Sequence, residues 1–176
     1  MLDFVFPSAA YEADARDYIR EFQRYGSDIN GTGSLDAYLE HSTYDAWLKN
    51  LYAQLDIANI PEGKVPCITY FAIREEDRRL IGMVNIRLGM NSFLRKEAGQ
   101  IGYSVRPSER RKGYGTEILC LALQVLRSVG YTETVVTCGK DNISSAGVIL
   151  KNGGIPEAEF FSRTYQEYIQ RYKIIL

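Results

Sequence analysis

The sequence predicts an α/β (α+β) fold, a mixed and mostly antiparallel central sheet of about six to seven strands flanked by helices. Two observations predict it. Segments with apolar residues at helical spacing are interspersed with short segments rich in β-branched and aromatic residues. The resulting order is β, α, α, β, β, β, α, β, α, β, β, which excludes a helical bundle or a β-sandwich. The length of 176 residues fits one domain.

The first third of the chain is predicted to be mainly helical. Residues 2–6 are typical of a short strand, and residues 8–25 carry apolar side chains at the i, i+3, i+4, i+7 spacing of a helix. The Ser-, Asp-, Asn- and Gly-rich residues 27–33 predict a loop. A second apolar stripe over residues 43–55 predicts another helix, which the Pro- and Gly-containing residues 60–66 end.

The middle of the chain changes to strand patterns. Residues 67–73 and 80–88 are rich in β-branched and aromatic side chains and flank a charged turn, so they predict a hairpin. Residues 99–105 predict a third strand, ended by Pro107.

The last third predicts two helices within the remaining strands. Residues 113–129 form the strongest amphipathic pattern, followed by a short buried strand over 132–138. Asp141 or Asn142 can cap a helix that runs to about residue 152. Two closing strands are expected at 157–161 and 168–175.

Composition argues against several classes of function. The chain has 21 Lys and Arg against 22 Asp and Glu, a net charge of −1, which disfavours a broadly basic nucleic-acid binder. Its one histidine is His41, and its three cysteines show no CxxC spacing, so no metal site is expected. No signal peptide or membrane-spanning apolar stretch is present, and we therefore expect a cytoplasmic location.

The charge is unevenly distributed along the chain. Residues 1–66 contain 11 acids and 5 bases, whereas residues 67–176 contain 11 acids and 16 bases. Because electrostatic potentials act locally, the total near zero is a cancellation between an acidic N-terminal part and a basic remainder.

Residues 105–116, with the sequence VRPSERRKGYGT, are the most informative segment and lie between a strand and the longest helix. Gly113 and Gly115 allow backbone to approach a ligand closely. The first helical turn offers free N–H groups and the positive end of the helix dipole, which suit a phosphate. Residues 106–112 add four bases against one acid. The segment predicts a pyrophosphate-binding loop, although it matches neither the Walker nor the dinucleotide glycine pattern.

This segment resembles the acetyl-CoA-binding motif Val-x-Pro-x-x-Arg-x-x-Gly-x-Gly of the GNAT superfamily of N-acetyltransferases. The matching positions are Val105, Pro107, Arg110, Gly113 and Gly115. Residues 141–145 followed by 151–154 resemble the Asn-x-x-Ser segment of that family with its Lys-x-Gly end. The two motifs occur in the family's order, and the expected element order is similar to the GNAT fold.

The resemblance implies a single acyl-CoA N-acyltransferase domain over residues 1–176. Its parts would be an N-terminal helical acceptor-side region (1–66), a cofactor-binding core (67–154) and closing strands (155–176). The strand ending at Val105 would splay from the strand at 132–138, and acetyl-CoA, the implied co-substrate, would lie in the gap. The implied cofactor-binding residues are Ser104, Val105, Arg110, Arg111, Lys112, Gly113, Tyr114, Gly115, Thr116, Asn142 and Ser145.

The proton-transfer residues depart from the usual family pattern. The helix position that often carries a tyrosine is Ile149, and the candidates for the usual strand acid are Gly99 and Gln100. The remaining catalytic candidates are Glu97, as a base that acts directly or through water, and Tyr103, as a donor to the departing thiolate. Both residue types occur more often without a catalytic role, as a solvated loop acid and a packed strand tyrosine.

The acidic N-terminal part suggests a cationic acceptor amine, a small molecule or a peptide. Carboxylates among Asp28, Asp36, Glu40 and Asp45 would steer it toward the site. Neither nucleic acid nor a membrane is expected as a partner, and a homodimer is compatible with the sequence. The departures at Ile149 and at the strand acid leave a non-catalytic acyl-CoA-binding or regulatory domain as the alternative.

Overall fold

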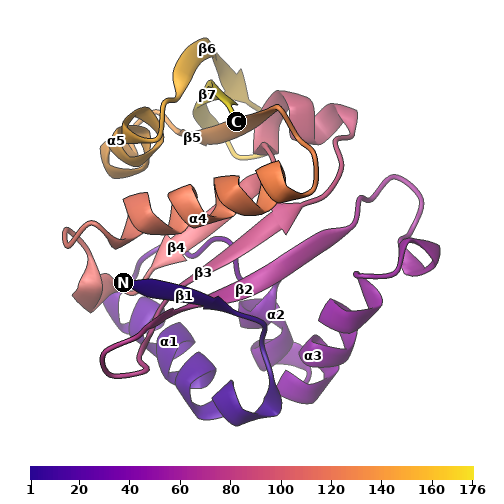
Figure 1. Ribbon diagram of the computed structural model, residues 1–176, viewed down its shortest axis with the longest axis vertical. Coiled ribbons are helices and arrows are strands. Elements are labelled where there is room, and N and C mark those ends of the chain that lie inside the picture. The colour runs from indigo at the N-terminus through magenta and orange to yellow at the C-terminus, as the bar shows by residue number, and fades with distance from the viewer.

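The computed structural model describes all residues 1–176 and contains seven strands in two hydrogen-bonded blocks (Figure 1). The first block has the order β1-β2-β3-β4 and the second the order β5-β7-β6, and all the pairings within the blocks are antiparallel. The strands are β1 (Leu2–Val5), β2 (Cys67–Arg74), β3 (Leu80–Arg87), β4 (Ile101–Val105), β5 (Glu133–Gly139), β6 (Ile155–Ser162) and β7 (Glu167–Ile175). The predicted fold class is confirmed.

Helices cover both faces of the first block. In Figure 1, helices lie below the first block, on what is called here the front face, and α4 lies above it, on the back face, with α5 beside the second block. The front helices are α1 (Glu12–Tyr25), α2 (Leu35–His41) and α3 (Tyr44–Ala53), and the others are α4 (Tyr114–Ser128) and α5 (Ile143–Lys151). Four short turns complete the chain, η1 (Ala9–Tyr11), η2 (Ile57–Asn59), η3 (Leu94–Ala98, a π-helical turn) and η4 (Pro107–Glu109).

Each face of the first block has its own apolar core. On the front face, Trp47 and Phe22 pack with Phe71 from β2, and all three are buried. On the back face, Ile118 and Leu119 of α4 pack against Val84 of β3. Burial of large aromatic and aliphatic side chains on both faces stabilises the layered arrangement.

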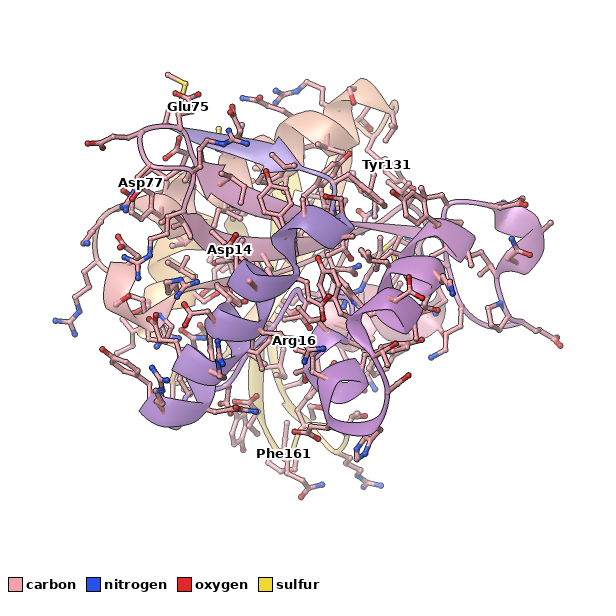
Figure 2. The ribbon with its side chains drawn as sticks, turned by 90° about the horizontal axis from the view of Figure 1, so that it is seen from below. Asp14, Arg16, Glu75, Asp77, Tyr131 and Phe161 are labelled. Atoms are coloured by element: carbon pink, nitrogen blue, oxygen red, sulfur yellow. The ribbon has the colours of Figure 1, made fainter.

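Figure 2 views the front face, with α1 nearest the viewer and Asp14 and Arg16 on its outer surface. Glu75 and Asp77 mark the β2–β3 turn at one side of this view, and Phe161 of β6 lies at the opposite side.

Three local features differ from the sequence-based expectation. Helix α2 lies between the predicted loop and the predicted helix over residues 43–55, where no element was expected, and it ends at Ser42, whose backbone is non-helical. The π-helical turn η3 lies in a segment without a predicted element. Gly99 has a φ of 67°, so β4 begins at Ile101 rather than at residue 99.

The two strand blocks meet at one point and then diverge. The Gln100 N–H donates to the Val135 carbonyl at 2.8 Å, and a Cβ on Gly99 would lie 2.7 Å from that same oxygen. Beyond this apex no ladder joins β4 to β5. The predicted splay between these strands is therefore present.

No helix in the molecule combines the length and the apolar character that a membrane crossing requires.

Candidate active site

The free edge of β4 borders the gap between the two blocks. Arg106 N–H donates to the Ile81 carbonyl at 2.8 Å, and Arg87 N–H donates to the Gln100 carbonyl at 2.9 Å. Antiparallel ladders alternate, so the even-numbered residues of β4 direct their backbone groups to β3. The backbone groups of Tyr103 and Val105 consequently face the gap without a strand partner.

The loop after β4 leads its backbone into the first turn of α4. Arg111 and Gly113 have φ values of 63° and 89°, and a Cβ on Gly113 would meet nothing within 4 Å. Thr116 N–H donates to the Gly113 carbonyl at 3.0 Å, whereas Tyr114 N–H and Gly115 N–H donate to no protein acceptor. Free donors beside an open glycine form a cradle for an anion.

The basic residues of this loop do not all contribute charge to the cradle. Arg106 is 2% exposed and donates to Asp17 at 2.7 Å and to Glu21 at 2.8 Å. Lys112 Nζ donates to Glu109 at 2.8 Å. The expectation of a local excess of three positive charges is therefore too high, because carboxylates compensate Arg106 and Lys112.

Arg110 turns toward the front face. Its Nε donates to the Val105 carbonyl at 3.2 Å and its terminal nitrogen donates to Ser27 Oγ at 2.8 Å. Its guanidinium lies 5.3 Å from the centre of the Phe22 ring. Arg111 is exposed and has no carboxylate within 4 Å, so it is the cation of the loop that remains free for a phosphate.

The second motif caps α5 and reaches back to β4. Asn142 is the N-cap, and its side-chain oxygen accepts from Ser145 N–H at 3.0 Å. The Ser145 hydroxyl lies 3.0 Å from the Tyr103 hydroxyl. The segments 99–105 and 142–152, predicted separately, are thus joined across the gap by two hydroxyl groups.

The groups around this contact are held in their neutral forms. Burial raises the pKa of Tyr103 to about 12, against a smaller opposing effect of its bond to Ser145. Burial likewise raises the pKa of the Cys138 thiol to about 11. The Tyr103 phenol and the Cys138 thiol are therefore both protonated across the neutral range.

Glu97 lies near the apex, in η3. Its carboxylate accepts from Ser162 Oγ at 2.7 Å, and its backbone carbonyl accepts from Thr137 Oγ1 at 3.0 Å. The side chain is 14% exposed, so it is fixed rather than freely solvated. Ile149, at the position where a tyrosine was considered, is fully buried in the back core.

These features fit an extended ligand with a phosphate end. The open edge of β4 offers free backbone groups for hydrogen bonds, and the cradle at Gly113 suits a phosphate or pyrophosphate group. No group of three or more His, Cys, Asp or Glu side chains is arranged to hold a metal ion.

Residues 9–155 match the family model described as an acetyltransferase (GNAT) domain. The chain belongs to this family of acetyltransferases, for which acetyl-CoA is the co-substrate. A comparison with curated protein sequences finds no match.

Several solved structures share the fold at low sequence identity. The ribosomal-protein-S5-alanine acetyltransferase of Vibrio fischeri has 15% identity and a TM-score of 0.73, over 99% of this chain and 92% of that one. The microcin C7 self-immunity acetyltransferase MccE, in complex with acetyl-CoA and AMP, has 13% identity and a TM-score of 0.71, over 99% and 92%. A spermidine N-acetyltransferase SpeG chimera from Vibrio cholerae and hSSAT has 14% identity and a TM-score of 0.61, over 99% and 94%.

The contacts that join β4 to the front face were not predicted from the sequence. Ser104 was expected among the cofactor-binding residues, but its hydroxyl accepts from Tyr18 at 3.0 Å and donates to the Asn30 carbonyl. No local pattern relates positions so far apart in the chain.

Proposed function

We propose that the chain transfers an acetyl group from acetyl-CoA directly to a primary amine of a small cationic molecule or peptide in a ternary complex. The observation that carries the proposal is the gap between β4 and β5, with the unpaired edge of β4 on one side and the Gly113 cradle at its end. That geometry suits the pantetheine and pyrophosphate parts of one ligand.

Cofactor binding is assigned mainly to backbone groups. Tyr103 and Val105 would bond the pantetheine, and the amides of residues 111–115 would hold the pyrophosphate, because those of Arg110 and Thr116 already donate to protein carbonyls. Arg111 would add positive charge. The side chain of Asn142 caps α5 and presents the first turn of that helix to the gap, which gives it a supporting role.

Tyr103 is proposed as the general acid. The acceptor nitrogen forms a bond to the thioester carbon, the C–S bond breaks, and the sulfur receives a proton from Tyr103, directly or through Ser145. The 3.0 Å contact between the two hydroxyls supports either route. Glu97 is proposed to take the proton released by the amine, through water, because its carboxylate is fixed near the apex.

The cationic nature of the acceptor is supported by a hollow of about 240 Å³ between α1 and α2. Its lining includes Asp28, Asp36 and Glu40, three of the four carboxylates considered from sequence. The fourth, Asp45, instead pairs with Lys49 at 2.8 Å on α3. The spermidine acetyltransferase chimera among the structural neighbours acts on a polyamine, which is consistent with this acceptor class.

Two measurements test the proposal. Calorimetric titration with CoA asks whether the chain binds the cofactor, and thiol release from acetyl-CoA with a panel of amines asks whether it transfers the acetyl group. We expect binding and amine-dependent thiol release. Binding without release for any amine supports the non-catalytic alternative, and the absence of both contradicts the cofactor assignment.

A further inference from the structure

The loop between α1 and α2 crosses the front of β4. This loop, residues 26–34, is called here the 26–34 segment. The Asn30 carbonyl accepts from Ser104 Oγ, and a Cβ on Gly31 would fall 2.7 Å from the Cα of Tyr103. The segment therefore rests directly on the strand whose other edge borders the gap.

Each end of the segment is also fixed. The Gly33 carbonyl accepts from Trp47 Nε1 at 2.9 Å, within the front core. At the other end, Ser27 Oγ accepts from Arg110 at 2.8 Å. The Trp47 contact therefore comes from the front helices. The contacts of Arg110 and Ser104 come from the loop after β4 and from β4 itself, which border the proposed cofactor site.

The Ser104 contact is the more strongly buried of the cofactor-side contacts. Ser104 is 8% exposed and Tyr18, which donates to it at 3.0 Å, is fully buried. Tyr18 also lies under the Arg106 guanidinium, 5.4 Å from ring centre to charge. A buried hydroxyl with both a donor and an acceptor partner is costly to remove, because its partners are left unsatisfied.

Arg110 is committed to the same segment. Its guanidinium lies over Phe22 of α1, bonds Ser27, and returns to the Val105 carbonyl. A side chain in this position faces the front helices rather than the cradle at Gly113. Its position in the motif alone suggests a ligand of the cofactor, whereas its contacts connect the cofactor loop to the 26–34 segment.

We infer that Ser104 and Arg110 are positioning residues that hold the 26–34 segment for acceptor binding and that their side chains are not ligands of acetyl-CoA. The inference rests on the proposed function, because it assigns the segment to the acceptor side. Asp28 lies in this segment, and Asp36 follows it at the start of α2. Loosening the segment would displace the carboxylates that face the acceptor and leave the backbone cradle intact.

The test compares Ser104→Ala and Arg110→Gln with the control Ser42→Ala, an exposed serine at the end of α2. Deuterium uptake of residues 26–34, the Kd for acetyl-CoA and the acceptor KM are measured for each. Loss of one hydrogen bond should raise the acceptor KM about three- to tenfold and increase uptake in the segment. The acetyl-CoA Kd should stay within about twofold, and the control should change none of the three quantities.

The outcomes separate this inference from the proposed function. A tenfold weaker acetyl-CoA Kd for Arg110→Gln with unchanged uptake would overturn it, since Arg110 would then be a phosphate ligand. If the wild-type chain acetylates no amine, the proposed function fails, while the uptake still decides whether the two residues hold the segment. Should Ser104→Ala unfold, Arg110→Gln, at an exposed side chain, still provides the same readouts, and Tyr18→Phe, which keeps the Ser104–Asn30 bond, is its buried control.

Discussion

The hydroxyl groups of Tyr103 and Ser145 lie 3.0 Å apart, one on β4 and the other in the first turn of α5. They come from opposite sides of the gap, so their contact marks where the two sequence motifs converge. Replacing Tyr103 by Phe should lower kcat about a hundredfold, because the proton donor is lost while the backbone of β4 is kept.

The control for this variant is Tyr44→Phe. Tyr44 is buried, and its hydroxyl donates one bond, to the Ser8 carbonyl at 2.9 Å. Steady-state thiol release and CoA titration of both variants provide the comparison. Equal kcat values for the two variants would show that Tyr103 only packs the strand.

The pH dependence of the reaction should reflect the environment of Tyr103. Burial raises its pKa from the ordinary 10 to about 12, so the phenol stays protonated and kcat should not decline through its ionisation below about pH 10. Between these values the unfolded chain releases the proton and the folded chain keeps it, so this group makes stability fall as pH rises. A kcat profile whose alkaline limb has its midpoint below 10, and disappears in Tyr103→Phe, would contradict this assignment.

Gly113→Val should abolish tight CoA binding. The φ of 89° disfavours any side chain, and the branched group would occupy the open space of the cradle. Gly130→Val is a matched control, with a φ of 91° and nothing within 4 Å of its Cβ, at the far end of α4. Both should lose at least about 1–2 kcal/mol of stability by urea unfolding. Calorimetry should show loss of CoA binding for Gly113→Val only. An equal loss of CoA binding in Gly130→Val would show that the effect comes from a damaged fold.

Arg106→Met should destabilise the fold by about 3 kcal/mol in urea unfolding, mainly through the loss of the Glu21 contact. The hydrogen bond from Arg106 lowers the pKa of Asp17. Burial would raise the pKa of Glu21, but the hydrogen bonds from Ser108 and Arg106 outweigh it, so the pKa of Glu21 is lowered as well. These contributions are present above the ordinary carboxyl pKa and are lost as pH falls through the lowered values. The loss of unfolding free energy on acidification should therefore be smaller in Arg106→Met than in the wild-type chain. Arg20→Met, which removes an exposed partner of Asp17 at 4.0 Å, should change stability little.

Salt should reveal the acceptor's charge. If Asp28 and Asp36 steer a cationic amine, kcat/KM for a polyamine should fall as ionic strength rises, and each Asp→Asn variant should weaken that dependence. Asp45 lies outside the hollow, so Asp45→Asn should leave the salt dependence of kcat/KM unchanged. Neutral amines that react equally well, with no effect of salt, would exclude a cationic acceptor.

The periodicity of apolar residues predicted most of the fold, because residues that face the core recur at helical or strand spacing. Ile118 and Leu119 illustrate this on α4, where both are buried. Helix α2 was not predicted, because its seven residues include only two buried or half-buried leucines, too short a pattern for the helical period to show. The turn at η3 likewise depends on long-range contacts, such as that of Glu97 with Ser162.

The candidate site was predictable in its backbone and less so in its side chains. Gly113 and Gly115 signalled the cradle because glycine has a direct conformational meaning. The partners of Arg106 and Arg110 were not predictable, because Glu21 and Ser27 lie more than eighty positions earlier in the sequence. A count of basic residues therefore overestimated the charge available to a phosphate.

The gap between β4 and β5 also affects how the chain behaves without its co-substrate. The backbone groups of Tyr103 and the N–H of Val105 form a short edge without a strand partner inside the fold, and such edges template the addition of strands from other molecules. The Tyr103–Ser145 contact and the apex at Gln100 keep this edge narrow and shielded at one end. A ligand that lies along β4 would satisfy the same groups, so acetyl-CoA would act on this chain as a protector against self-association as well as an acetyl donor.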